Sequence, residues 1–198
     1  MYTNLQDRLY EKLAEEAKNE EKIKDVTHHL ERIFNILGVN SFDLSTQDTP
    51  KRIAKMWVNE TCKNLNNNNI EELTEKMTLF DAEGKVQPVT VETEFTSWCE
   101  HHFMPFFGKI KVTYQPEKKI IGLSKIPRIV EYFSQKPQVQ ERLGKEIAEY
   151  LLLVTDAPWV QVDIFDTTHT CVSCRGIRSN ATTDTSYLAT RAGVIKEV

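Results

Sequence analysis

The spacing of apolar residues changes once along the chain, and this change restricts the fold more than any other feature of the sequence. Apolar residues recur every three or four positions between Leu5 and Leu37, as on one face of a helix, and Gly38 follows as a stop signal. From residue 89 to 95 and again from 110 to 114, apolar and polar residues alternate, as in strands with one buried face. We therefore predict a helical N-terminal segment followed by a domain built around a sheet.

Further helix and strand signals give the order of the elements. Thr49 and Pro50 are typical of a helix start, and the polar run over residues 64–72 indicates a loop. We predict a short helix after Ser124, a longer helix after Pro137, and a last strand over residues 159–177. This order is typical of an α+β fold with an antiparallel sheet. We expect an N-terminal helical arm over residues 1–65 and a second domain over residues 66–198.

Composition excludes several broad classes of protein. The net charge of -4 argues against a general binder of nucleic acid or membrane surfaces. The sequence lacks an apolar run of the roughly 20 residues that a membrane helix needs, and its N-terminus lacks the apolar centre of a signal peptide. We expect a cytoplasmic protein, in which the four cysteines are thiols or metal ligands rather than disulfides.

The stretch "SWCEHHFMP" gathers side chains that bind metals and transfer protons between two predicted strands. Cys99 and His102 have the C-x2-H spacing of a ligand pair. Further thiols, Cys171 and Cys174, lie in the last predicted strand, and spacing alone would complete a closed structural zinc site with four ligands.

Strand geometry favours a different ligand set. Residues three apart on a regular strand point to opposite faces, so Cys171 and Cys174 cannot both reach one ion without a bulge. Cys99, His102 and Cys171 would then bind zinc and leave a position for water, as in catalytic zinc sites. His101 and His169 would lie nearby for proton transfer. A structural zinc site and a pair of buried thiols remain the alternatives.

Four blocks of sequence resemble GTP cyclohydrolase I, in the family's order and over roughly residues 30 to 185: "DTPKRIAKMW", "CEHHF", "IGLSKIPRIVEYFSQKPQVQERL" and "HTCVSCRGIR". The resemblance implies a tunnelling fold (T-fold), an α+β arrangement with two helices on one face of an antiparallel sheet. It implies a homodecamer with active sites between subunits, residues 66–198 being the catalytic domain. The implied reaction converts GTP and water to 7,8-dihydroneopterin triphosphate and formate, within pterin and tetrahydrofolate biosynthesis and one-carbon metabolism.

The same resemblance implies a role for each matching residue. It implies zinc on Cys99, His102 and Cys171, whose bound water would have a pKa near 7. His101 would protonate the leaving ring nitrogen, His169 would assist ring opening, and Ser124 would donate a proton in the later ribose rearrangement. Gln140 and Glu141 would recognise the guanine edge. The expected phosphate-binding residues are Lys125, Arg128 and Arg175, with Arg52 and Lys55 as further candidates.

Two rival functions remain open from the sequence. A T-fold reductase acting on 7-cyano-7-deazaguanine would use a cysteine nucleophile and a nicotinamide cofactor, and the two-cysteine, one-histidine set together with the basic residues argues against it. A non-enzymatic assembly protein stabilised by zinc is the other. Incubation with GTP distinguishes the three, because only the cyclohydrolase releases formate and forms a pterin.

Overall fold

The computed structural model describes residues 2–40, 43–65 and 70–192. The chain divides into two compact units, Met1–Lys63 and Asn64–Val198. The assignment of catalysis to the second of the two predicted domains stays a prediction.

The first unit is helical, as the apolar spacing predicts. Its elements are α1 (Tyr2–Leu37), α2 (Thr49–Met56) and the π-helical turn η1 (Trp57–Thr61). Gly38 ends α1 with a φ of 74°, a conformation that glycine adopts without strain. Leu30 of α1 and Ala54 of α2 are buried. In the described ranges no helix, α1 included, combines the length and the apolar character that crossing a membrane requires.

The predicted loop over residues 64–72 is wrong at its C-terminal end. Residues 66–69 of that stretch lie outside the described residues, and α3 (Ile70–Glu75) begins directly after them. Ile70 and Leu73 are one helical turn apart and both contact the core, while acidic residues in the first turn complement the helix dipole. The asparagine-rich composition of this stretch therefore led to the prediction of a loop where the short helix α3 begins.

The second unit is built on a main sheet with the strand order β5-β2-β3-β6-β7. The strands are β2 (Val89–Cys99), β3 (Met104–Tyr114), β5 (Pro137–Gln138), β6 (Trp159–His169) and β7 (Thr182–Thr190). All neighbours pair antiparallel except β5, which pairs parallel with the end of β2. A smaller antiparallel pair joins β1 (Leu79–Asp81) to β4 (Lys119–Ile121).

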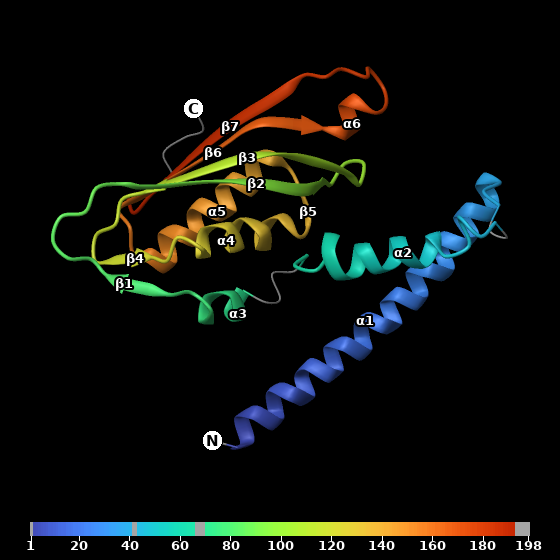
Figure 1. Cartoon of the computed structure of the whole chain (residues 1–198), viewed down its shortest axis with the longest axis horizontal. Helices are drawn as coiled ribbons and strands as arrows, with labels where there is room; N and C mark the ends of the chain where they lie inside the picture. Colours follow the sequence, from blue (N-terminus) through green and yellow to red (C-terminus); the bar gives the residue numbers. More distant parts are fainter. Residues whose placement is uncertain (1, 41–42, 66–69, 193–198) are drawn as a thin grey trace. The chain divides into compact units, whose positions relative to one another are not determined.

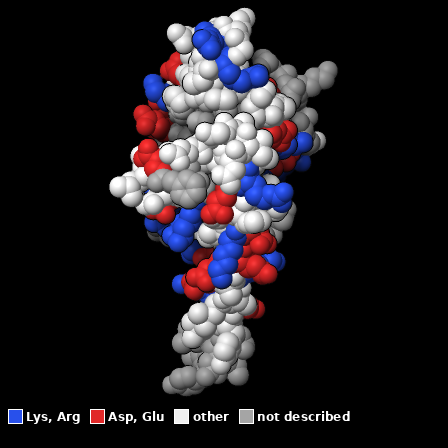
Figure 2. All heavy atoms as spheres, turned by 90° about the vertical axis from the view of Figure 1, so that its right-hand side faces the viewer, with Lys and Arg blue, Asp and Glu red and all other residues white. Residues whose placement is uncertain are grey.

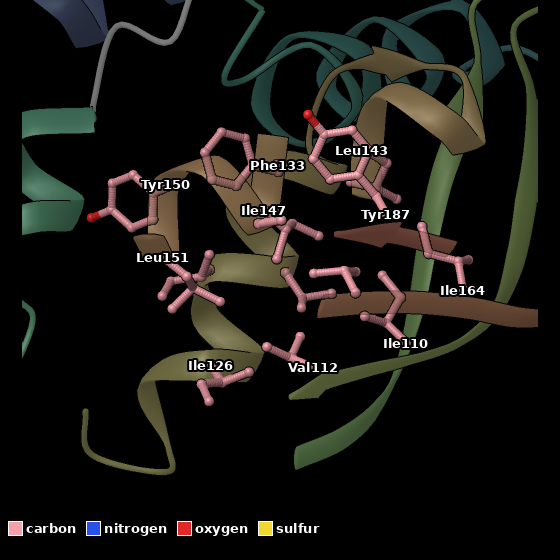
Figure 3. Close-up of a cluster of buried hydrophobic side chains, with 14 of the residues drawn as sticks. Ile110, Val112, Ile126, Phe133, Leu143, Ile147, Tyr150, Leu151, Ile164 and Tyr187 are labelled. Carbon is pink, nitrogen blue, oxygen red and sulfur yellow. The ribbon is translucent and has the colours of Figure 1, made fainter. Parts of the chain in front are cut away.

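Helices α4 (Lys125–Ser134) and α5 (Gln140–Thr155) lie together on one face of the main sheet (Figure 1). Figure 3 shows how their apolar side chains meet those of the strands: Ile126, Phe133, Leu143, Ile147 and Leu151 come from the helices, and Ile110, Val112 and Ile164 from the sheet. Burial of this apolar surface supplies the main stabilising free energy of the unit. The predicted α+β arrangement, an antiparallel sheet with two helices on one face, is confirmed.

The last predicted strand is wrong beyond His169. The ladder between β6 and β3 pairs His169 with Phe106, so the next partner of the ladder would be Pro105. Proline has no backbone N–H to donate, and the chain turns instead into the short helix α6 (Thr170–Ser173). The Thr170 hydroxyl donates to the carbonyl of Pro105 at this point. Cys171 is therefore placed by a helical turn, and the strand argument that separated it from Cys174 does not apply.

Candidate active site

Two buried thiols and one imidazole meet where β2 and β6 end and α6 begins. Cys99 is the last residue of β2, His169 the last of β6, and Cys171 lies in α6. The Sγ atoms of Cys99 and Cys171 are 3.9 Å apart, and the thiols and a ring nitrogen of His169 all lie within 4.8 Å of one another. Residues 72 positions apart in the sequence thus form one compact group of metal-ligating atoms.

The geometry and chemistry of this group fit a tetrahedral metal site. Two thiolates bound to zinc at about 2.3 Å in tetrahedral geometry lie about 3.8 Å apart, close to the observed separation. Burial raises the pKa of the Cys171 thiol, the adjacent Cys99 raises it further, and the charge of Arg175 opposes both. A bound cation would favour the thiolate forms that burial disfavours. The group is therefore one that could hold a metal ion.

The predicted ligand His102 lies outside this group. It belongs to the exposed turn between β2 and β3, which is closed by a hydrogen bond from the N–H of Phe103 to the carbonyl of Cys99, 2.9 Å. His101 in the same turn places Nδ1 3.5 Å from the Sγ of Cys99. The structure thus brings His101 to the thiol of Cys99 and leaves the side chain of His102 exposed.

His169 is held more firmly than either histidine of the turn. Its ring stacks on Phe106, with centroids 4.7 Å apart and planes only 3° from parallel. Its Nε2 lies 3.0 Å from Oε1 of Gln140. Burial lowers the pKa of His169, and the charge of Glu141 opposes that shift only in part. Burial therefore disfavours the charged form of the imidazole, and the stacking and the hydrogen bond hold the ring in one orientation beside the thiols.

Three of the predicted substrate-binding residues lie next to this group. Gln140 and Glu141 begin α5, and Arg175 lies two residues after the end of α6. The Arg175 Nε–H donates to the carbonyl of Cys171, 3.0 Å away. Glu141 also lines a hollow of about 130 Å³ together with Asp184 and Ser186 of β7. Residues of α5, β6 and β7 therefore line a small cavity that reaches Glu141 at the start of α5.

Three further predicted residues of the second unit, Ser124, Lys125 and Arg128, are not brought to the thiols within one chain. Ser124, Lys125 and Arg128 lie at the N-terminal end of α4, whereas the C-terminal end leads to β5, which pairs with Cys99. Ten helical residues span about 15 Å, so these side chains lie toward the opposite end of the sheet. Arg52 and Lys55 belong to α2 of the first unit. Figure 2 shows that Lys and Arg side chains (blue) alternate with Asp and Glu side chains (red) on this face of the molecule.

Several residues of the site carry no motif that sequence reasoning singled out. Phe106 and Thr183 support His169 and Gln140, and an ion pair joins Glu100 of the turn to Arg142 of α5. Thr183 belongs to β7, whose buried Tyr187 and Ala189 alternate with less buried neighbours. That alternation is the sequence signal from which β7, the strand that carries Thr183, could have been predicted.

Comparison with known proteins agrees with the resemblance to GTP cyclohydrolase I that the sequence motifs indicate. The sequence model of the family described as GTP cyclohydrolase I matches residues 4–196. GTP cyclohydrolase 1 of Vibrio campbellii is 41% identical over 176 residues, which cover 87% of this chain and 78% of the relative. The protein of that name from Yersinia enterocolitica is 44% identical over 165 residues, covering 81% and 73%. Among solved structures, the apo form of the archaeosine synthase QueF-Like aligns with a TM-score of 0.42 and 16% identity, covering 56% of this chain and 98% of that one.

The match to the family spans almost the whole chain and includes both units of the structure. It contains the thiols and histidines of the site as well as the cations at the start of α4. This chain therefore belongs to the GTP cyclohydrolase I family.

Proposed function

We propose that this protein converts GTP and water to 7,8-dihydroneopterin triphosphate and formate, with zinc as its cofactor. One observation carries the proposal: the two buried thiols and the stacked His169 converge at one place. The names of the curated relatives support it. In the net reaction carbon 8 of guanine leaves as formate and one water molecule is consumed, so no oxidant or reductant is needed.

We propose that Cys99, Cys171 and His102 hold the zinc ion. The separation of the two thiols suits a tetrahedral ion, and His102 shares the turn that follows Cys99. When bound in such a site, zinc acts as a Lewis acid that activates water at neutral pH. His169 is the alternative third ligand, because one of its ring nitrogens belongs to the compact group.

The histidines that do not bind the metal would move protons. In neutral His169 the Nε2–H points to Oε1 of Gln140, so Nδ1 carries the free lone pair and can accept a proton. His101 lies beside Cys99 on an exposed turn, where its ring can exchange protons with solvent. It is our candidate for the acid that protonates the leaving ring nitrogen of guanine.

Recognition of GTP would use charges of both signs. The carboxylate of Glu141 is exposed at the hollow and can accept two N–H groups of the guanine edge. Arg175, next to the thiols, would pair with a phosphate through its planar guanidinium.

The other predicted contacts would come from a neighbouring subunit. Ser124, Lys125 and Arg128 lie at the start of α4, the end of the helix that is farther from β5 and Cys99 of their own chain. We propose that they complete the site of an adjacent copy in a homodecamer, Ser124 as the proton donor of the ribose rearrangement. Arg52 and Lys55 remain candidates for the triphosphate.

Incubation of the zinc-loaded protein with GTP tests the proposed activity. We expect formate release and, after oxidation, a fluorescent pterin in equal amount. Consumption of NADPH with 7-cyano-7-deazaguanine, but no formate from GTP, would instead identify the reductase. Turnover of neither substrate would leave a zinc-stabilised assembly protein and refute the proposal.

Histidine variants test the proposed division between metal binding and proton transfer. His101→Ala should keep about one zinc per chain and lose about 100-fold or more in formate release. His102→Ala should lose the zinc itself, because the C-x2-H pair is broken. His169→Ala serves as the comparison: loss of zinc there, with retention in His102→Ala, would make His169 the third ligand.

A further inference from the structure

Gln140 has little side-chain surface left for a substrate. It is 3% exposed, although it is the first residue of α5. Its Oε1 lies 3.0 Å from Nε2 of His169 and accepts a hydrogen bond from Oγ1 of Thr183 at 2.7 Å. Its Nε2 donates to the backbone carbonyl of Thr183 at 3.3 Å. Both lone pairs of the amide oxygen are therefore used inside the protein.

These contacts fix which way the amide of Gln140 faces. The carbonyl of Thr183 can only accept a hydrogen bond, so the amide nitrogen must face it and the amide oxygen must face His169. Since that oxygen can only accept, Nε2 of His169 must carry the proton. Nδ1 of the neutral ring is then left with its lone pair directed away from Gln140.

Phe106 fixes the remaining freedom of the imidazole. Its ring lies parallel to that of His169 at 4.7 Å, on the strand that pairs with β6. Stacking sets the plane of the imidazole, and the hydrogen bond to Gln140 sets its rotation within that plane and its tautomer. Together these two contacts determine where Nδ1 points.

We propose that Gln140 and Thr183 are positioning residues that hold His169 in its Nε2–H tautomer, and that Gln140 does not bind guanine. This inference rests on the proposed function and changes one role that the family resemblance implies. Glu141, which is exposed at the hollow, is left as the residue that recognises the base. Thr183 gains a role that the sequence did not indicate.

Kinetic constants of variants distinguish positioning from substrate binding. Gln140→Met keeps the length of the side chain and removes its hydrogen bonds; we expect kcat to fall by about tenfold to 100-fold, with KM for GTP changed less than about threefold. Thr183→Val should lower kcat in the same direction, and the matched Thr183→Ser should restore it. A rise in KM at unchanged kcat for Gln140→Met, together with normal kinetics for Thr183→Val, would overturn the inference.

A spectroscopic measurement tests the tautomer without GTP. In zinc-loaded protein labelled with ¹⁵N-histidine, the resonances of His169, identified by their loss in His169→Gln, should show the proton on Nε2. Thr183→Val, a change at an exposed residue, should leave the fold intact and shift the His169 resonances toward a tautomer mixture. A proton on Nδ1 in the wild type would refute the inference, whereas absence of GTP turnover with the expected tautomer would refute only the proposed function.

Discussion

A Cβ at Gly108 would collide with the backbone of the neighbouring strand next to the candidate site. The added carbon would lie 2.9 Å from the carbonyl oxygen of Phe165 and 2.9 Å from the Cα and Oγ1 of Thr167. Ordinary contacts begin at 3.4 Å, so β6 would have to move by about half an ångström. Since Thr167 precedes His169 by only two residues, the movement would also disturb the imidazole.

The cost of Gly108→Ala follows from this overlap. Overpacking typically costs about 1–3 kcal/mol, and the obstacle here is mostly backbone, which cannot rotate away as a side chain can. We expect the free energy of unfolding to fall by about 2 kcal/mol, which lowers Tm by about 4–8 °C in a chain of this length. Urea denaturation and thermal melting, both followed by far-UV circular dichroism, measure the two quantities.

Gly144→Ala is the matched control for Gly108→Ala. Gly144 is also buried, but its added Cβ would meet only ordinary contacts, the nearest being Cδ1 of Ile164 at 3.5 Å. Within α5, alanine is favoured over glycine by about 1 kcal/mol. We expect an unchanged or higher Tm. Wild-type stability of Gly108→Ala, or an equal loss in Gly144→Ala, would refute the reasoning about close approach.

Two further predictions concern a charge in the sheet and the thiols. Burial alone would raise the pKa of Asp163, but hydrogen bonds from Ser186, Gln161 and Lys111 outweigh it and lower the pKa below 3.8. Asp163→Asn should therefore cost about 0.5–1 kcal/mol at pH 7, and urea titrations should show the difference vanish as the pH falls through the lowered pKa of Asp163, because the stabilisation is lost once the carboxylate is protonated. A constant difference across that range would contradict the assignment. Cys171→Ser should lose zinc by elemental analysis, whereas exposed Cys174→Ser should retain both zinc and activity; the reverse result would identify Cys174 as the ligand.

Periodicity predicted the elements that bury one face against a core. The alternation over residues 89–95 and 110–114 lies within β2 and β3, and the four-residue spacing of Leu143, Ile147 and Leu151 lies in α5, where all three are fully buried. In each of these patterns the apolar residues are the ones that face the core. The patterns could therefore be interpreted without knowledge of the partner strands.

Features that depend on a partner strand could not be predicted in this way. The sequence after Trp159 continues to look like a strand beyond His169, and only the register with β3 shows that Pro105 stands opposite the next position. β7 was missed because its first half is exposed and polar, so that alternation begins only near Tyr187. The contact of Gln140 with Thr183 depends on that strand and was invisible for the same reason.

The candidate site was predicted in its chemistry better than in its geometry. Cys99 and Cys171 are adjacent in the structure, and His101 and His169 lie beside them. His102 is exposed, and its role as the third ligand stays a prediction. The cations at the start of α4 could not be placed from the sequence, because spacing along the chain does not tell how far the start of that helix lies from Cys99 in the folded unit.

The central claim is that the thiol and histidine group works as a metal-dependent cyclohydrolase site. The most direct measurement is formate release from GTP by protein stripped of metal with a chelator, before and after the addition of about one zinc ion per chain. We predict no formate from the stripped protein, an unchanged far-UV circular dichroism spectrum, and recovery of activity on addition of zinc. Formate release that continues at the full rate without metal would contradict the claim, as would loss of the folded spectrum on chelation, which would make the zinc structural.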